Sequence, residues 1–248
     1  MPHDLPKIAL IIPCYNEEAR LPVSELNDYL VDHPSVKFFL VNDGSDDNTL
    51  NLLKSMEREN HEQILVHDLP VNQGKAEAVR QGFLTCLDAC DREYIGYWDA
   101  DLATPLVELD RFVAIAAEKD ADVVMGSRIR RLGARISRLP HRHYLDRLFA
   151  TVVSSYLALN IYDTQCGAKL FSSELARRIF AQPFLSRWLF DVELIARTIA
   201  DGGIEAAEQR ILEVPLAVWE DKSGSKLHLN HMLAAPFDLA RIFWHYRA

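Results

Sequence analysis

The stretch Tyr94–Asp101, which reads Tyr-Ile-Gly-Tyr-Trp-Asp-Ala-Asp, decides the fold class of the chain. Its first five residues are apolar, aromatic or glycine, and they predict a short buried strand. Two acids, Asp99 and Asp101, follow this strand directly. Strands without polar alternation are typical of parallel sheets covered on both faces, and the ligands of such sheets bind at the carboxyl ends of the strands. The two acids therefore indicate which edge of the sheet carries a functional site.

Short apolar runs and amphipathic stretches alternate on both sides of this strand. Further strands are expected at residues 8–12, 38–41, 64–66 and 123–125. Helices are expected between them at 23–32, 47–60, 75–89 and 105–119. This alternation predicts an α/β fold with a mostly parallel sheet flanked by helices. The second half is less regular, with helices expected at 175–180, 190–200 and 227–248 and one or two strands within 204–218.

Composition narrows the classes of protein to consider. The 248 residues favour one domain, or one domain with an added subdomain. A formal net charge of −9 argues against a general nucleic-acid binder, which needs a basic surface. The four cysteines form no Cys-x-x-Cys pair, which favours reduced thiols and a cytoplasmic location. We expect no signal peptide and no membrane-spanning helix, because the longest nearly apolar run, 148–159, is too short.

Asp99 and Asp101 suit a divalent cation. Carboxylate oxygens are the ligands that Mg²⁺ and Mn²⁺ prefer, and substrate phosphates can complete the coordination shell. The alternative is that one of these acids only caps the helix expected after Thr104 and Pro105. Their place at the end of a strand favours the metal site.

Asp43 stands at the end of the second expected strand, in the run Asn-Asp-Gly-Ser-Asp-Asp at residues 42–47. This run predicts a tight turn and a helix cap, which its later acids can supply. Asp43 is then left to accept hydrogen bonds from ribose hydroxyls or from the N–H of a base. Further on, Gly74 and Lys75 precede a helix, and the helix N-terminus favours an anion there. An ordinary turn explains Gly74 equally well.

Arginines gather after the fifth expected strand, beginning with Arg128. The others are Arg130, Arg131, Arg135, Arg138, Arg142 and Arg147. In a chain of net charge −9 the cluster favours an anion-binding lip, because arginine binds phosphate with two parallel hydrogen bonds. A solvated basic loop is the alternative. The chain has neither Gly-x-Gly-x-x-Gly nor a P-loop sequence, which argues against dinucleotide binding and against a P-loop nucleotide hydrolase.

Together these segments resemble family 2 glycosyltransferases with the GT-A fold, over about residues 7–226. The matching segments are Pro13–Glu17, Asn42–Ser45, Asn72–Lys75, Asp99–Asp101 and Gly126–Arg128. Two further segments, Asp163–Phe171 and Trp188–Leu194, look most like the dolichyl-phosphate or polyprenyl-phosphate β-glucosyltransferases and mannosyltransferases. The resemblance implies a Rossmann-like sheet with a less regular C-terminal part. It also implies a catalytic domain at 1–226, followed by an amphipathic helix at 227–248.

The resemblance also implies roles for individual residues. Those expected to bind the nucleotide sugar, the metal or the phosphates are Pro13, Tyr15, Glu17, Asp43, Lys75, Asp99, Asp101, Arg142 and Lys222. Asp99 and Asp101 are expected to hold Mg²⁺ or Mn²⁺. Arg128 is expected to contact the acceptor phosphate, and Gln165 to face the donor sugar or the metal. Asp191 lies where many relatives place an acid near the reacting carbon.

The implied reaction is the inverting transfer of a hexose from a nucleotide sugar, a UDP-hexose in preference to a GDP-hexose, to a lipid phosphate. Two alternatives stay open: transfer to a soluble hydroxyl acceptor, with Asp191 as general base, and a nucleotidyltransferase that makes nucleotide sugars. The helix near the C-terminus carries Asp238, Arg241 and His245 on one face and aromatic residues elsewhere. It either packs on the domain or rests on the inner face of a membrane as a peripheral contact. No nucleic acid is expected as a partner.

Overall fold

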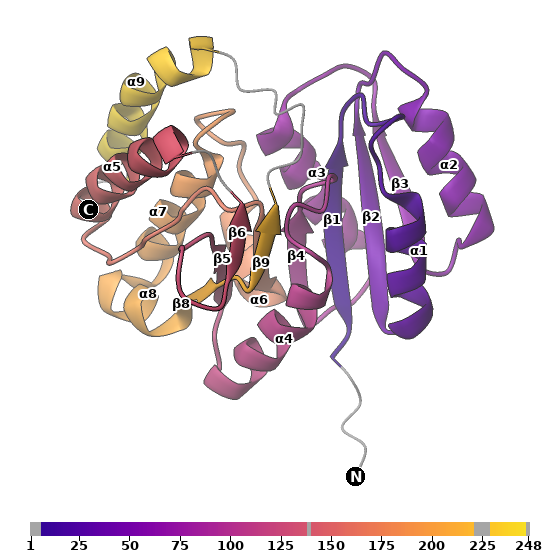
Figure 1. The fold of residues 1–248 in the computed structure, drawn as a ribbon, viewed down its shortest axis with the longest axis horizontal. Coiled ribbons are helices and arrows are strands. Elements are labelled where there is room, and N and C mark those ends of the chain that lie inside the picture. The colour runs from indigo at the N-terminus through magenta and orange to yellow at the C-terminus, as the bar shows by residue number, and fades with distance from the viewer. Residues whose placement is uncertain (1–5, 138–139, 221–228, 247–248) are drawn as a thin grey trace. The chain divides into compact units, whose positions relative to one another are not determined.

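The computed structural model describes residues 6–137, 140–220 and 229–246, without the side chains of 140–146, 148 and 229–234. The prediction of an α/β protein with a mostly parallel sheet and flanking helices is confirmed (Figure 1). The chain divides into two compact units. The first consists of residues 1–102 and 170–183, and the second of residues 103–169 and 184–248.

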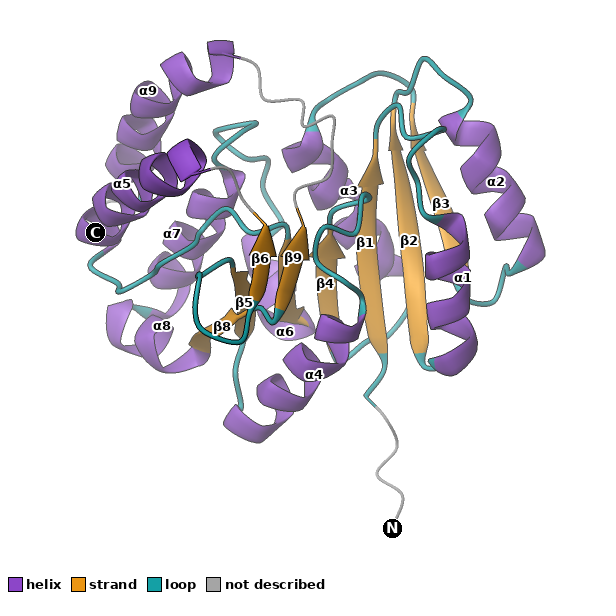
Figure 2. Cartoon of the chain, viewed as in Figure 1, coloured by secondary structure: helices purple, strands orange, loops and turns teal. Residues whose placement is uncertain are grey.

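The first unit contains four neighbouring strands in the order β3-β2-β1-β4, and the pairs β3–β2, β2–β1 and β1–β4 are all parallel. The strands are β1 (Ile8–Cys14), β2 (Val36–Asp43), β3 (Ile64–Leu69) and β4 (Tyr94–Trp98). The helices between them are α1 (Val23–Asp32), α2 (Thr49–Glu59) and α3 (Lys75–Ala89). Because parallel strands end at one edge of the sheet, the loops after β1, β2 and β4 lie on the same side. Figure 2 shows these loops in teal above the strands.

The core of the first unit is aromatic and tightly packed. Helix α3 packs on β1 and β2, and Gly82 lies at this contact. Phe83 stacks on Phe180 with 3.7 Å between ring centroids and meets Phe171 edge-on at 5.7 Å. Phe180 follows α6 (Ser173–Ile179), and Phe171 lies in β7 (Ala168–Ser172), the strand that brings the chain back into this unit.

The second unit carries two further parallel strand pairs. Strand β5 (Val123–Ser127) pairs with β8 (Ile211–Pro215), and β6 (Arg135–Ser137) pairs with β9 (Val218–Glu220). Its helices are α4 (Val107–Lys119), α5 (Pro140–Leu157), α7 (Phe190–Gly202), α8 (Ile204–Arg210) and α9 (Leu229–His245). Among the helices of the described residues, none is both long and apolar enough to cross a membrane.

The expectation of one or two strands in 204–218 is confirmed for its second half and wrong for its first. Residues 204–210 form helix α8, and strand structure begins only at Ile211. Glu, Ala, Gln and Arg fill 205–210, and these residues favour a helix over a strand. Gly203, with a φ of 84°, ends α7 and allows the chain to start a new helix at once. The boundary expected between 226 and 227 lies outside the described residues and stays a prediction.

We expect Gly82→Ala to lower the free energy of unfolding by about 1–3 kcal/mol, the usual cost of overpacking a core. A Cβ at this position would collide with the Ile11 side chain and lie 2.9 Å from Val41 Cγ2. Urea titration followed by circular dichroism measures the change. Gly202→Ala is the control, because its Cβ would meet Ala206 at an ordinary 3.4 Å. Equal stability of the two variants would contradict the close packing of α3 on the sheet.

Candidate active site

The loops after β1 and β2 are fastened to one another in the first unit. The amide of Asn16 donates to Ser45 Oγ at 3.0 Å, and Asn16 Oδ1 accepts from the Asp46 amide at 2.9 Å. The Glu17 amide donates to Thr49 Oγ1 at 2.8 Å. Asn16 adopts a φ of 52°, a conformation that asparagine tolerates better than most residues. Pro13 lies near the end of β1, and Tyr15 and Glu17 lie on the loop that follows, whose backbone is held in place by these bonds.

Asp43 is buried at the end of β2, and its carboxylate holds the loop before α3. Oδ1 accepts from the Gln73 amide at 2.7 Å, and Oδ2 accepts from the Gly74 amide at 2.9 Å and from Asn72 Nδ2 at 3.0 Å. The sequence predicts that the N-terminus of α3 binds an anion. For the amides of Gln73 and Gly74, that anion is the Asp43 carboxylate itself. Its predicted contact with a ribose or a base stays a prediction.

Asp99 and Asp101 lie in the turn that follows β4. The Leu102 amide closes the turn by donating to the Asp99 carbonyl at 3.1 Å. Lys75, the first residue of α3, places Nζ 2.5 Å from Asp99 Oδ1 and 5.6 Å from the centre of the Tyr97 ring. Both side chains of the ion pair are more than a third exposed. Carboxylate oxygens that solvent can reach are suitable ligands for a hard cation such as Mg²⁺ or Mn²⁺.

The carboxylates alone would not complete such a coordination shell. Among the described residues, no group of three or more His, Cys, Asp or Glu side chains gathers at one point. Two acids therefore fit a cation that takes its remaining ligands from water and from a bound diphosphate. Their role as metal ligands stays a prediction.

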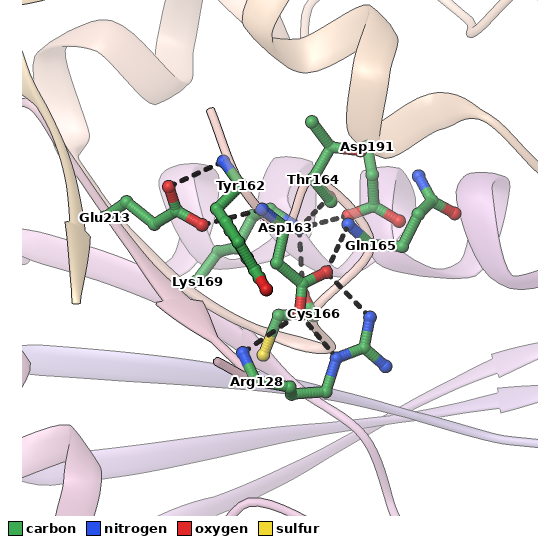
Figure 3. Close-up of polar contacts among 9 residues, drawn as sticks. All are labelled: Arg128, Tyr162, Asp163, Thr164, Gln165, Cys166, Lys169, Asp191 and Glu213. Atoms are coloured by element: carbon green, nitrogen blue, oxygen red, sulfur yellow. Dashed lines mark hydrogen bonds and ion pairs between the residues drawn. The ribbon is translucent and has the colours of Figure 1, made fainter. Parts of the chain in front are cut away.

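In the second unit, Arg128 and Asp163 form a two-pronged ion pair (Figure 3). Arg128 Nε donates to Asp163 Oδ2 at 2.6 Å, and Nη2 donates to Oδ1 at 2.7 Å. The Arg128 amide adds a third bond to Oδ2 at 3.0 Å. The guanidinium also lies 5.4 Å from the centre of the Trp219 ring. Arg128 follows β5, so this pair ties the end of the strand to the segment that begins at Asp163.

Glu213, in β8, holds the same segment from another side. Its two oxygens accept from the amides of Tyr162 at 2.8 Å and Asp163 at 2.6 Å. Burial raises the pKa of Glu213, against the opposing effect of the hydrogen bonds that it accepts. The backbone at 162–163 is thus fixed by a partly buried carboxylate.

Lys169 and Asp191 form a second buried ion pair in this unit. Lys169 Nζ lies 2.5 Å from Asp191 Oδ1 and donates to the carbonyls of Thr164 at 2.9 Å and Cys166 at 2.8 Å. Asp191 is the second residue of α7, where the helix dipole favours a negative charge. The segment 163–166 is therefore held at Asp163 by Arg128 and Glu213, and at its carbonyls by Lys169 (Figure 3).

Two buried polar atoms on this segment have no hydrogen-bond partner among the residues the structure describes. They are Thr164 Oγ1 and Gln165 Nε2. A buried donor or acceptor without a partner costs about 1–3 kcal/mol, so native proteins rarely keep one without a reason. A ligand that both donates and accepts, such as a sugar hydroxyl, could satisfy them. The predicted contact of Gln165 with the donor sugar or the metal stays a prediction.

The structure brings the predicted residues together in two groups, one in each unit. The first unit holds Pro13, Tyr15, Glu17, Asp43, Lys75, Asp99 and Asp101, and the second holds Arg128, Gln165 and Asp191. The side chain of Arg142 and the whole of Lys222 lie outside the described residues.

Sequence reasoning missed three charged residues of the second group. They are Asp163, Lys169 and Glu213, each of which fixes the backbone or another charge. Lys169 stands among Ala168, Leu170 and Phe171 in a buried strand, and a charge at such a position is a signal that could have found it.

All four cysteines lie within the described residues, and all carry free thiols, as predicted. Burial raises the pKa of Cys166 to about 11 and also raises the pKa of Cys14. Both therefore stay protonated near neutral pH and have little nucleophilic character.

The family model for glycosyl transferase family 2 matches residues 9–180. The chain is also similar to proteins named dolichyl-phosphate beta-glucosyltransferase. One from Trichomonas vaginalis is 32% identical over 96% of this chain and 71% of its own length. One from Dictyostelium discoideum is 32% identical over 96% of this chain and 74% of its own length. The human one is 30% identical over 89% of this chain and 69% of its own length. The chain belongs to glycosyl transferase family 2, and it is a glycosyltransferase.

Solved structures support the fold. A glucosyl-3-phosphoglycerate synthase from Mycobacterium tuberculosis, in complex with Mn²⁺, UDP and its product, has a TM-score of 0.67 at 20% identity. The matched region covers 97% of this chain and 80% of the synthase chain. The same enzyme with Mn²⁺, UDP-glucose and phosphoglyceric acid has a TM-score of 0.68, covering 97% and 79%. The expected GT-A fold is confirmed.

We expect Arg128→Met to lower the free energy of unfolding by about 3 kcal/mol or more, because it leaves the buried Asp163 carboxylate without its cation. Guanidinium titration of both proteins measures the loss. Arg210→Met is the matched control, since Arg210 is about half exposed and its pair with Asp122 is worth under about 1 kcal/mol. A loss at Arg128 no larger than at Arg210 would show that the pair contributes little to stability.

Proposed function

We propose that the protein transfers glucose from UDP-glucose to dolichyl phosphate or a similar polyprenyl phosphate, with inversion and with a divalent cation. The observation that carries the proposal is its identity of 30–32% to dolichyl-phosphate beta-glucosyltransferases over most of both chains. The relatives' names supply the sugar and the acceptor class. The solved structures in complex with UDP-glucose and Mn²⁺ agree with the donor and the metal.

The environment of Asp191 supports a phosphate rather than a hydroxyl as the acceptor. A hydroxyl needs a general base to take its proton, and Asp191 is the candidate for that role. One oxygen of this carboxylate is already bound to the Lys169 ammonium inside the second unit. A phosphate monoester loses its second proton near pH 6, so it reaches neutral pH largely ionised and needs positioning more than a base.

The first unit is proposed to bind the donor. Pro13 and Asp43 lie at the ends of β1 and β2, and Tyr15 and Glu17 lie on the loop after β1. All four are proposed to line the nucleotide pocket. When the donor binds, Lys75 is proposed to leave its ion pair with Asp99 and to bind the diphosphate instead. Its present pair is exposed, so the exchange costs little.

Asp99 and Asp101 are proposed to hold Mg²⁺ or Mn²⁺ together with the diphosphate oxygens. The cation would neutralise the negative charge that develops on the UDP leaving group. Lys222 is proposed to add a further positive charge there.

The second unit is proposed to bind the acceptor and the sugar. Arg128, with its orientation fixed by Asp163, and Arg142 are proposed to contact the acceptor phosphate. Gln165 is proposed to contact the transferred glucose. Attack by a phosphate oxygen on the face of the anomeric carbon opposite to UDP inverts its configuration.

An exposed aromatic surface on α9 supports contact with a membrane. Phe237 and Trp244, seven residues apart on one face of the helix, are 79% and 81% exposed. On α5, Tyr156 is 66% exposed and stacks on Phe243 with 4.3 Å between ring centroids. Large exposed aromatic patches are typical of membrane or protein contacts, and tryptophan and phenylalanine favour the bilayer interface.

The rest of α9 is packed on the second unit. Leu239 and Ile242 are buried, Asp238 Oδ2 accepts from Ser186 Oγ at 2.6 Å, and Arg241 donates to the Leu185 carbonyl at 3.2 Å. Both interpretations of this helix therefore have support: one face packs on the protein, and another displays aromatic rings. We propose that the protein works at the cytoplasmic face of a membrane as a peripheral enzyme.

We expect Asp101→Asn to keep the fold and to lose most turnover, at least a hundredfold, because a charge that holds the metal is removed. Transfer of radiolabelled glucose from UDP-glucose to a short polyprenyl phosphate, with and without Mn²⁺, measures the effect. Asp88→Asn, an exposed change at the far end of α3, is the control and should keep wild-type turnover. An Asp101→Asn enzyme with wild-type, Mn²⁺-dependent turnover would remove this residue from the metal site.

We expect the double variant Phe237→Ser, Trp244→Ser to bind anionic liposomes at least tenfold more weakly and to keep its turnover on a short, soluble acceptor. Both side chains are exposed, so the fold should survive, whereas truncation would uncover the core around Ile242. Val31→Ser, an exposed apolar position of the first unit, is the control. Liposome sedimentation provides the measurement, and unchanged binding of the double variant would refute the membrane role of this surface.

A further inference from the structure

Lys169 connects two parts of the second unit that are distant in the sequence. Its side chain is 1% exposed, and its ammonium binds the carbonyls of Thr164 and Cys166 and the Asp191 carboxylate. The three acceptors match the three N–H bonds of an ammonium group. The Lys169 side chain therefore joins Asp191 to the segment 163–166.

We infer that Lys169 is the positioning residue of the transfer site, fixing Asp191 and the segment 163–166 in the arrangement that receives the sugar. The inference rests on the proposed function, because that function assigns substrate contacts to Gln165 and to the region of Asp191. Lys169 itself touches no substrate in this arrangement and acts through the groups that it holds.

Lys169 makes contacts that the stability of the fold alone does not require. Two buried charges are expensive to remove from water, and apolar residues of the same size often stabilise a core as well or better. An ammonium that binds two loop carbonyls as well as a carboxylate fixes a geometry that apolar packing cannot. Beside these carbonyls stand Thr164 Oγ1 and Gln165 Nε2, the two buried polar atoms without a partner among the described residues.

A second buried ion pair on the same helix supplies a matched control. In α7, Arg197 Nη2 lies 2.7 Å from Glu193 Oε1, and both side chains are buried. Tyr246 also donates to this carboxylate at 2.9 Å, and Arg197 lies against the Phe184 ring at 4.4 Å. No residue of this pair belongs to the proposed site. Lys169→Met and Arg197→Met therefore remove similar buried cations, one beside the proposed site and one away from it.

The experiment compares the two variants well below both melting temperatures. Both are expected to melt earlier than the wild type. Lys169→Met should lower kcat for transfer to a short polyprenyl phosphate at least tenfold, with the Kd for UDP unchanged within twofold by calorimetry. Arg197→Met should keep kcat within twofold of the wild type. Equal kcat in the two variants would overturn the inference and leave Lys169 a structural residue.

Thr164→Val provides a second test should Lys169→Met fail to fold. Replacing a buried hydroxyl without a partner by a methyl group of similar size should leave the melting temperature unchanged or raise it. If the segment held by Lys169 receives the sugar, kcat/KM for UDP-glucose should still fall at least threefold. Unchanged kcat/KM in this variant would overturn the inference.

Failure of the proposed function would give a different result. A wild-type protein that does not glucosylate polyprenyl phosphate refutes the proposed acceptor. The same variants are then compared by their hydrolysis of UDP-glucose, where a loss in Lys169→Met without a loss in Arg197→Met still supports the positioning role. Equal hydrolysis in the two variants would overturn it.

Discussion

The two-pronged ion pair between Arg128 and Asp163 is the constraint on which the second unit depends. A carboxylate buried at this depth needs a cation and further donors, and Asp163 receives three bonds from Arg128 alone. The Glu213 carboxylate then fixes the amides at 162–163, and Lys169 fixes the carbonyls that follow. The result is a segment that cannot relax without leaving a buried charge unpaired. Such rigidity is what a site needs to hold a sugar and an acceptor in a reactive geometry.

The loops of the first unit are also held rigid, but by a different kind of interaction. Its loops are held by hydrogen bonds between side chains and backbone amides, with the buried Asp43 carboxylate at the centre. Gly44 belongs to this arrangement: its φ is +60°, and a Cβ there would collide with the backbone of residues 71–72. A glycine is therefore required for the β2 loop to approach the loop before α3. The group proposed to bind the donor is thus set mainly by backbone geometry, whereas the group in the second unit is set mainly by buried charges.

This difference explains which parts the sequence could predict. Strand–helix alternation and the acids after β2 and β4 are local patterns, so the α/β fold and the group of Asp43, Asp99 and Asp101 follow from short segments read alone. Asp163 pairs with Arg128, 35 positions away, and its amide donates to Glu213 in β8, 50 positions away. No local sequence pattern predicts such contacts. Helix α8 has only seven residues and runs directly into β8, so its short pattern does not stand out from the strand that follows. The polar face of α9 was recognised, but its partners Ser186 and Leu185 come from a distant loop.

The cations of the two groups differ in their freedom to exchange partners, and this difference bears on how an acidic protein would bind the two proposed substrates. Lys75 is paired to Asp99 in an exposed position, where an ion pair is worth under about 1 kcal/mol, so a diphosphate can take the place of the carboxylate. Arg128 and Lys169 are paired where water is scarce, and separating either pair would leave a buried carboxylate behind. A phosphate that meets Arg128 must therefore share it with Asp163. The described part of the second group holds two cations against three carboxylates, so most of the attraction for an acceptor phosphate has to come from charges outside the buried cluster. Because the buried charges are already committed to one another, we propose that they fix the shape of the second group, and that exposed cations supply the affinity for phosphate.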